Sequence, residues 1–295
     1  MAMKTKNKPI KSSLAKRRLQ SFARDKMAVV GVIGMAIITL LCICAPLLTP
    51  YDPGRMNLKE MNLPMSPEHP LGTDTVGRDV LARLLYGGRW SIAIGVIASL
   101  CVNTVGAMLG AIAGFFGGWV DKVLVTIQEY ISFFPQILLI LLFISIFGEA
   151  NVMLLILIWT CTGWGGTMRI VRGRIMSLKQ EPYIESCRAN GISSASIMFH
   201  HMIPNTMGPI IVNVVGNVSG YMLQEAALAY LGLGLPAKIP TWGNIINAAK
   251  NIGIIDAYPV LWLAPGITIC LFVLCVTFFG NGLRDALDPT QRGQE

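Results

Sequence analysis

Six apolar runs, separated by polar and charged stretches, organise the chain. They cover residues 28–48, 90–116, 123–147, 152–168, 207–233 and 259–282. Each is close to the length of about 20 residues that an α-helix needs to cross the hydrocarbon core of a bilayer. The pattern therefore predicts an all-α integral membrane protein with six transmembrane helices, surrounded for most of its length by the lipid bilayer.

Composition and charge agree with a membrane location. Hydrophobic residues make up 53% of the chain and charged residues only 14%, which is too apolar for an ordinary soluble domain. The net charge of +8 would suggest nucleic-acid binding if the positive residues formed a basic face. They flank the apolar runs instead, so we expect no nucleic acid partner.

The N-terminal segment predicts the orientation. Its positive residues are Lys4, Lys6, Lys8, Lys11, Lys16, Arg17, Arg18, Arg24 and Lys26. Because Lys and Arg are enriched on the cytoplasmic side of membrane proteins, this segment predicts a cytoplasmic N-terminus. The first apolar run lacks a following A-x-A-like cleavage site, so we expect it to remain as a membrane anchor.

With six crossings, the chain divides into segments on alternating sides of the membrane. We expect a basic cytoplasmic segment (1–27), a first transmembrane helix (28–49), an extracytoplasmic loop (50–89), a transmembrane core (90–283) and a cytoplasmic tail (284–295). The core includes a cytoplasmic loop at 169–206 and an extracytoplasmic loop at 234–258. The cytoplasmic loop begins with Arg169 and is rich in positive residues, in agreement with the positive-inside rule.

The extracytoplasmic segment before the second apolar run conflicts with that rule, because it carries Arg78, Arg83 and Arg89. Apolar positions within residues 76–86 follow helical spacing: Val80, Leu81, Leu84 and Leu85. We therefore predict an amphipathic helix that lies in the membrane interface and lets its arginines reach lipid headgroups.

Glycines recur at intervals of four in two of the apolar runs. Gly106, Gly110 and Gly114 share one helix face, and Gly216 and Gly220 repeat the spacing. Small residues at this spacing allow membrane helices to approach closely. We favour packing inside a single bundle as their role.

Helix-breaking and ionisable residues within the apolar runs are candidates for a transport pathway. Pro135 and Pro265 each remove a backbone hydrogen bond and predict local bends beside a pathway. Glu225 carries a carboxylate at membrane depth, where such groups face a bundle interior or a water-filled cavity. Its role is either pathway lining and gating or a structural hydrogen bond. Glu129, in the third run, is a further pathway candidate.

The cytoplasmic loop contains the sequence EPYIESCRANGISSASIMFHHMIPN at residues 181–205. Pro182 suits the first turn of a helix, and Tyr183, Ile184 and Cys187 give that helix an apolar side. Gly191 permits a sharp reversal of the chain. These residues predict a short helix followed by a tight turn.

A second short helix follows the turn. Ser193 or Ser194 can cap its start, and Pro204 discourages its continuation before Asn205 and the next transmembrane run. The predicted helix-turn-helix would project into the cytoplasm with an exposed apolar face. Such a face needs a partner.

The loop resembles the EAA loop of bacterial ABC importer permeases. The residues that carry the resemblance, with Tyr183 beside them, are Glu185, Ser186, Cys187, Gly191, His201, Ile203 and Pro204. Ser186 and Cys187 stand where the family usually has alanine, and His201 stands where it usually has isoleucine. The resemblance implies that this loop docks into a cleft on an ATP-binding subunit and couples it to transport.

Further segments narrow the resemblance to the dipeptide, oligopeptide and nickel permease family, and within it to the second, C-type permease. They are residues 69–92, 228–236, 240–246 and 280–289. The resemblance implies a type I permease fold in a bacterial cell membrane, a second permease as heterodimer partner, one or two ABC ATPase subunits and an extracytoplasmic substrate-binding protein. It favours di- or oligopeptides as substrates, with nickel or another metal chelate as the alternative.

A membrane-embedded enzyme and a passive channel are the alternatives from other classes. The sequence contains no G-x-x-x-x-G-K-[ST] phosphate-binding loop, so we expect ATP and Mg²⁺ to bind partner subunits and no cofactor to bind this chain. Its histidines are His69, His200 and His201; the adjacent pair points in different directions on a helix, so we predict no metal site. A channel would not need the coupling loop.

Overall fold

The computed structural model describes residues 20–248, 250 and 252–287, and within them it contains helices and no strand. The predicted all-α fold is confirmed. Most of the basic segment predicted at 1–27 and of the tail predicted at 284–295 lies outside these residues. The longest helices are α2 (Lys26–Ile43), α4 (Val80–Phe116), α11 (Ile203–Tyr230) and α14 (Val260–Leu287).

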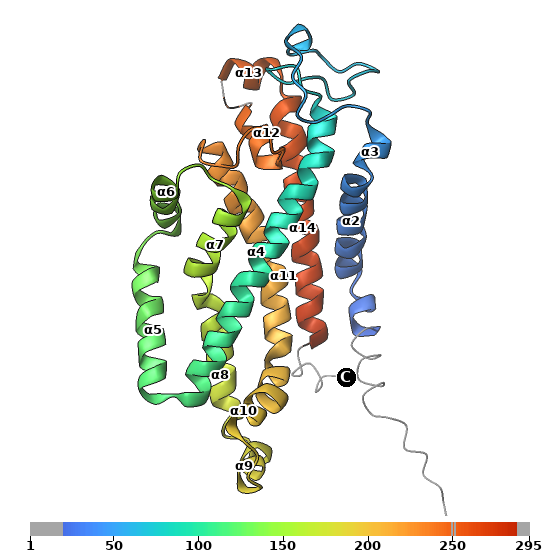
Figure 1. Ribbon diagram of the computed structural model, residues 1–295. Coiled ribbons are helices and arrows are strands. Elements are labelled where there is room, and N and C mark those ends of the chain that lie inside the picture. The colour runs from blue at the N-terminus through green and yellow to red at the C-terminus, as the bar shows by residue number, and fades with distance from the viewer. Residues whose placement is uncertain (1–19, 249, 251, 288–295) are drawn as a thin grey trace, which may run out of the picture.

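The long helices form one bundle around α4, which crosses the molecule obliquely in Figure 1. α2 packs on α14, α14 on α11, and α11 on α4. On its other side α4 packs along α8 (Gly165–Leu178), where a Cβ built on Gly110 would lie 2.6 Å from the Met168 carbonyl oxygen. The first glycine series therefore packs helices inside this chain, as predicted.

Two helix pairs are bent at short breaks. α5 (Gly118–Phe133) and α6 (Gln136–Phe147) meet at 85°, and α7 (Val152–Gly163) and α8 meet at 43°. Pro135 lies at the first break. A proline favours extended backbone in the residue before it, so α5 ends before Phe134 and α6 begins after Pro135. Pro265, in contrast, lies inside α14, which continues as one helix.

The described residues contain three helices that are long and apolar enough to cross a membrane, or up to five if each bent pair is one span. α2, α4 and α14 are the unbroken ones. α11 has 28 residues but is not among them, because polar side chains such as Asn213 and Glu225 lower its hydropathy. The prediction of six crossings stays a prediction.

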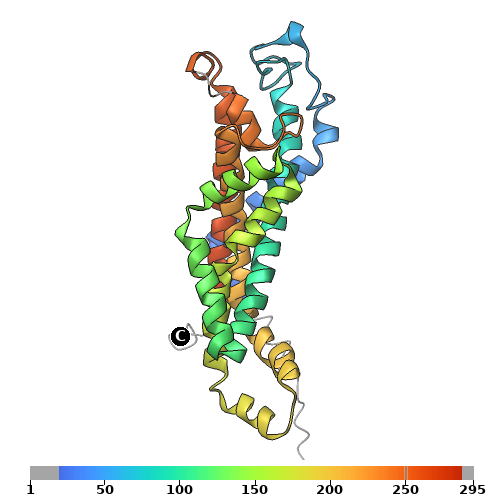
Figure 2. The ribbon, with the colours of Figure 1, turned by 60° about the vertical axis from the view of Figure 1, so that its left-hand side comes forward.

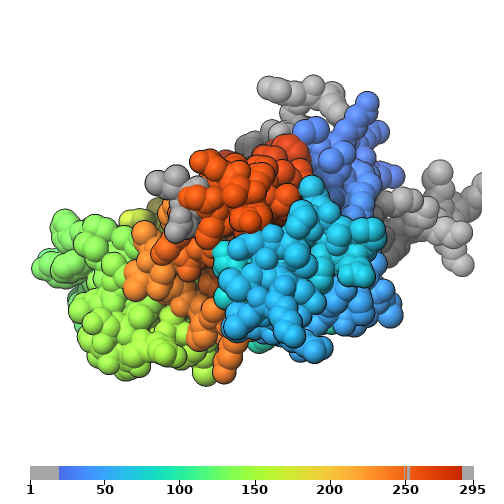
Figure 3. Space-filling view, turned by 90° about the horizontal axis from the view of Figure 1, so that it is seen from above, coloured from blue at the N-terminus to red at the C-terminus, as the bar shows by residue number. Residues whose placement is uncertain are grey.

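The bundle has two distinct ends. At the α9 end, α9 (Pro182–Ala189), α10 (Ser194–Ser196) and the π-helical segment η2 (Ile197–Met202) project beyond the other helices, as Figure 2 shows. At the α12 end are the loop of residues 49–79 with its short helix η1 (Leu58–Glu60), α3 (Ala45–Leu48), α12 (Trp242–Ala248) and α13 (Ile252–Ala257). Seen from above in Figure 3, the loop and the α12–α13 segment cover much of this end.

The helix predicted at 76–86 exists from Val80 onward, but the prediction that its arginines reach lipid headgroups is wrong. From Val80 onward these residues are the first two turns of α4, and Arg78 and Arg83 are only 5% and 1% exposed. The two arginines cannot reach lipid headgroups because they are held by the loop and the segment before α12. Burial and ion pairing with Asp74 therefore account for these two positive charges at this end of the bundle.

Candidate functional site

The first candidate site is the α9 hairpin, which comprises residues 181–205. Glu181 is the N-cap of α9 and Pro182 occupies its first turn, as predicted. Gly191 has a φ of +75°, and its amide donates to Arg188 O at 2.9 Å while the Ile192 amide donates to Cys187 O at 3.1 Å. This glycine-terminated helix end makes the sharp reversal predicted at Gly191.

The second arm of the hairpin begins at Ser193, whose Oγ accepts from the Ser196 amide at 3.3 Å. The predicted stop at Pro204 is wrong, because the chain continues from α10 through η2 into α11. Pro204 lies in the first turn of α11, where its missing N–H and fixed φ are tolerated. The hairpin is thus joined to α11 without an intervening loop.

The predicted exposed apolar face is also wrong in part. Ile184 is fully buried, and Cys187 is half-buried. Both pack against a cluster that includes Ile175, Ile197 and Met202 of the same chain. The apolar side of α9 therefore anchors the hairpin to α8 and η2.

The opposite side of the hairpin is exposed. Glu185, Ser186, Gly191 and Pro204 lie on the surface, whereas His201 and Ile203 are half-buried. Tyr183, Ile192 and Phe199 are exposed apolar side chains. The sequence interpretation missed Ile192 and Phe199, although an aromatic residue in a predicted cytoplasmic loop is a usable signal.

Tyr183 connects the two arms of the hairpin. Its Oη lies 3.5 Å from Asn205 Nδ2. Partial desolvation raises the pKa of the Tyr183 phenol, and the nearby Glu181 carboxylate adds to this. The phenol is therefore neutral at physiological pH and can accept from the amide.

The second candidate site lies between the two bent helix pairs. A cavity of about 390 Å³ is lined on one side by Pro135 and its neighbours and on the other by the break between α7 and α8. Glu129 is exposed on α5 but does not line this cavity. Of the two candidates from the third run, Pro135 lies at the cavity.

Arg169 also lines this cavity, which the sequence interpretation missed. It was expected to begin the cytoplasmic loop, but it lies inside α8, four residues after Gly165. Arg169 Nη1 donates to Gln128 Oε1 at 3.1 Å, and Gln128 Nε2 donates to Ser132 Oγ at 2.6 Å. α8 continues to Leu178, so the helix extends beyond the charged residue at which the apolar run ends.

Glu225 lies inside the chain near the α12 end. Its side chain is 1% exposed, and Oε1 accepts from Thr241 Oγ1 at 2.7 Å. Thr241 Oγ1 in turn accepts from the Asn244 amide at 3.1 Å. These bonds connect α11 to the start of α12, which supports the structural alternative for Glu225.

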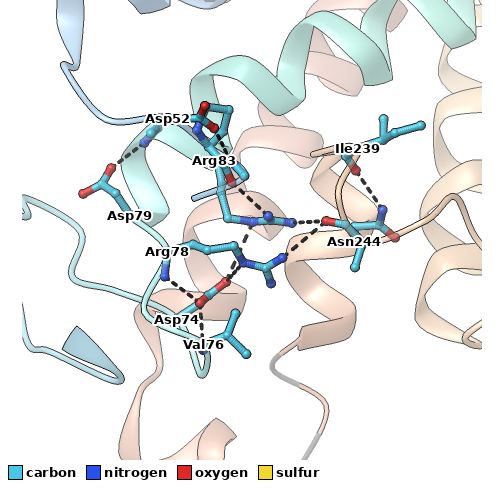
Figure 4. A network of polar contacts seen from close by, with 12 residues as sticks. Asp52, Asp74, Val76, Arg78, Asp79, Arg83, Ile239 and Asn244 are labelled. Atoms are coloured by element: carbon cyan, nitrogen blue, oxygen red, sulfur yellow. Dashed lines mark hydrogen bonds and ion pairs between the residues drawn. The ribbon is translucent and has the colours of Figure 1, made fainter. Parts of the chain in front are cut away.

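A network of buried charges holds the α12 end together, as Figure 4 shows. Arg78 Nε donates to Asp74 Oδ2 at 2.7 Å, and the Arg83 guanidinium lies 3.9 Å from the same oxygen. Arg83 also donates to Pro53 O, and Arg78 donates to Ala237 O, at 3.1 and 3.3 Å. The network ties the loop of residues 49–79 to the segment that precedes α12.

Two family descriptions match the chain. Residues 106–293 match the binding-protein-dependent transport system inner membrane component, and residues 13–64 match the N-terminal transmembrane domain of oligopeptide transport permease C. The first match covers the bent helix pairs, the α9 hairpin, α11, α12, α13 and the described part of α14.

Named relatives align over almost the whole chain. The oligopeptide transport system permease protein OppC of Bacillus subtilis is 35% identical over 95% of this chain and 91% of the relative. The dipeptide transport system permease protein DppC of Alkalihalophilus pseudofirmus is 36% identical over 91% of this chain and 88% of the relative. The oligopeptide transport system permease protein OppC of Haemophilus influenzae is 35% identical over 94% of this chain and 88% of the relative.

Proposed function

This chain belongs to the family of binding-protein-dependent transport system inner membrane components, and we propose that it is the C-type permease subunit of an ATP-driven importer of di- or oligopeptides. As a member of that family it is a multi-pass inner membrane protein of a transport system. The substrate class is inferred from the relatives, which are named as oligopeptide and dipeptide permeases.

The observation that carries the coupling role is the α9 hairpin. Its exposed side presents Glu185, Ser186 and Gly191, while Ile184 anchors it to the bundle. We infer that an ABC ATPase subunit receives this side in a cleft and that the α9 end is therefore cytoplasmic. ATP and Mg²⁺ bind to one or two such partner subunits.

The way the hairpin is connected supports its mechanical role. It joins α8 directly to α11, and both helices pack on α4. A displacement of the hairpin by closing ATPase subunits is thereby transmitted to three membrane helices. Such a coupling requires that the hairpin makes different contacts in the two states of the ATPase.

A second permease subunit completes the pathway in this proposal. α5 and α6 present exposed apolar side chains, including Trp119, Phe133 and Phe147, although a lipid contact would suit the same residues. The cavity at Pro135 opens beside them. The substrate-binding protein delivers the peptide at the α12 end, which is then extracytoplasmic.

A nickel or metal-chelate substrate is the alternative within the same family resemblance. Growth on an essential amino acid supplied only as a tripeptide tests the substrate class in cells that lack this gene and other peptide uptake systems. Restoring the gene is expected to restore growth, whereas an empty vector is not. Restored accumulation of nickel without growth on the peptide would contradict the peptide assignment.

A further inference from the structure

Arg169 lies deeper in the bundle than the positive residues around it. The Asp121–Arg172 ion pair joins the first turn of α5 to α8 near the α9 end. Gln128, the partner of Arg169, lies seven residues beyond Asp121 on α5, which is about 10 Å further along the helix axis. The Arg169–Gln128 contact therefore lies about 10 Å further from the α9 end than the Asp121–Arg172 ion pair.

The guanidinium of Arg169 is incompletely paired. Arg169 is exposed, and no ion pair within the described part of the chain includes it. Gln128 supplies one neutral acceptor for a group with five N–H donors. Most of its N–H donors therefore remain available to a ligand that enters the cavity.

The cavity beside Arg169 is built to hold that partner. Its polar lining consists of Gln128, Ser132, Gln136 and Thr162, and Arg169 is the one charged residue among the described lining residues. A Cβ on Gly165 would lie 2.4 Å from Gln128 Cγ, so a glycine here leaves room for the side chain that positions Arg169. A polar cavity with one unopposed positive charge suits an anion.

We propose that Arg169 binds a carboxylate of the peptide as it passes through the membrane, a proposal that rests on the permease function above. Arg presents paired N–H donors whose geometry matches a carboxylate, and each substrate peptide carries one at its C-terminus. Arg169 is thus a specificity-determining residue of the pathway, acting after selection by the external binding protein.

Uptake of matched peptides tests the proposal. A tripeptide with neutral side chains is compared with its C-terminal amide in proteoliposomes that contain the complete transporter, saturating binding protein and ATP. Arg169→Gln is expected to lower maximal uptake of the free acid about tenfold, the scale of one charge-assisted hydrogen bond, and that of the amide less than twofold. The preference of the binding protein cancels in each ratio of variant to wild type.

Further variants identify the group involved. Arg169→Lys keeps the charge and is expected to retain free-acid uptake within about threefold. Arg174→Gln removes an exposed charge on the same helix outside the cavity lining and is expected to leave both peptides unaffected. An amidated peptide with a Glu side chain distinguishes a side-chain carboxylate from the C-terminal one, since sensitivity to Arg169→Gln returns only if side chains also bind.

Three results would overturn the proposal. They are an equal loss for the acid and the amide, no loss for either peptide, and a reduced yield of the assembled permease pair in Arg169→Gln, which would assign the carboxylate to the partner subunit. Absence of any peptide uptake by the wild-type transporter would instead refute the proposed function.

Discussion

The close packing of α4 on α8 predicts that Gly110→Ala is destabilising. A Cβ at this position would lie 2.6 Å from the Met168 carbonyl oxygen and 2.9 Å from Val171 Cβ. Reaching an ordinary contact of about 3.4 Å requires the helices to separate by about 0.8 Å, since the closest atom belongs to the backbone and cannot rotate away. Overpacking of this kind costs about 1–3 kcal/mol.

Gly220→Ala on α11 is the matched control. A Cβ there meets no atom of the described structure within 4 Å. Alanine favours a helix over glycine by about 0.5–1 kcal/mol at both positions, so the difference between the variants isolates the steric clash.

Thermal unfolding of the purified chain in detergent measures that difference. We expect Gly110→Ala to melt about 5 °C below Gly220→Ala, the shift that corresponds to roughly 2 kcal/mol. Equal melting temperatures, or a lower one for Gly220→Ala, would refute the packing of α4 on α8 described above.

Three other predictions concern the hairpin, the orientation and Glu225. Gly191→Val forces a β-branched residue to a φ of +75°, at a cost of about 1–2 kcal/mol. Membrane insertion should persist, whereas recovery of the ATPase in a pull-down and peptide uptake should both fall; Gly191→Asn is the control that tolerates this φ. Normal assembly and uptake by Gly191→Val would show that the hairpin is not the coupling element. In a chain without native cysteines, a membrane-impermeant thiol reagent applied to intact cells should label Lys250→Cys but not Ser194→Cys, and the reverse pattern would invert the topology. Glu225→Gln keeps an acceptor for Thr241 and should assemble and transport like wild type, whereas Glu225→Leu should lower complex yield; normal assembly with altered transport in Glu225→Gln would favour a pathway role instead.

Local signals in the sequence predicted the elements that depend on local backbone chemistry. Gly191 makes the expected reversal because only a residue that tolerates positive φ fits there. Ser193 caps the second arm through its own hydroxyl. Pro135 breaks the third apolar run because it restricts the residue before it.

Features that depend on distant contacts could not be predicted in the same way. Arg78 is buried, and it donates a hydrogen bond to the carbonyl of Ala237, which is 159 residues away in the sequence. No local sequence pattern contains that contact. Ile184 is buried because η2 and α8 cover it, whereas the sequence shows only that α9 has an apolar side. The position of Arg169 at the cavity was missed because a hydropathy pattern shows a charge only as the end of an apolar run and does not show which residues of another helix face it.

Peptide uptake by proteoliposomes with the complete transporter distinguishes an ATP-driven permease from a passive channel. We predict that a labelled peptide accumulates against its gradient only when ATP and the binding protein are both present, and that a non-hydrolysable ATP analogue does not support accumulation. Equilibration of the peptide without ATP, at the same rate as with it, would show passive transport and refute the ATP-driven mechanism.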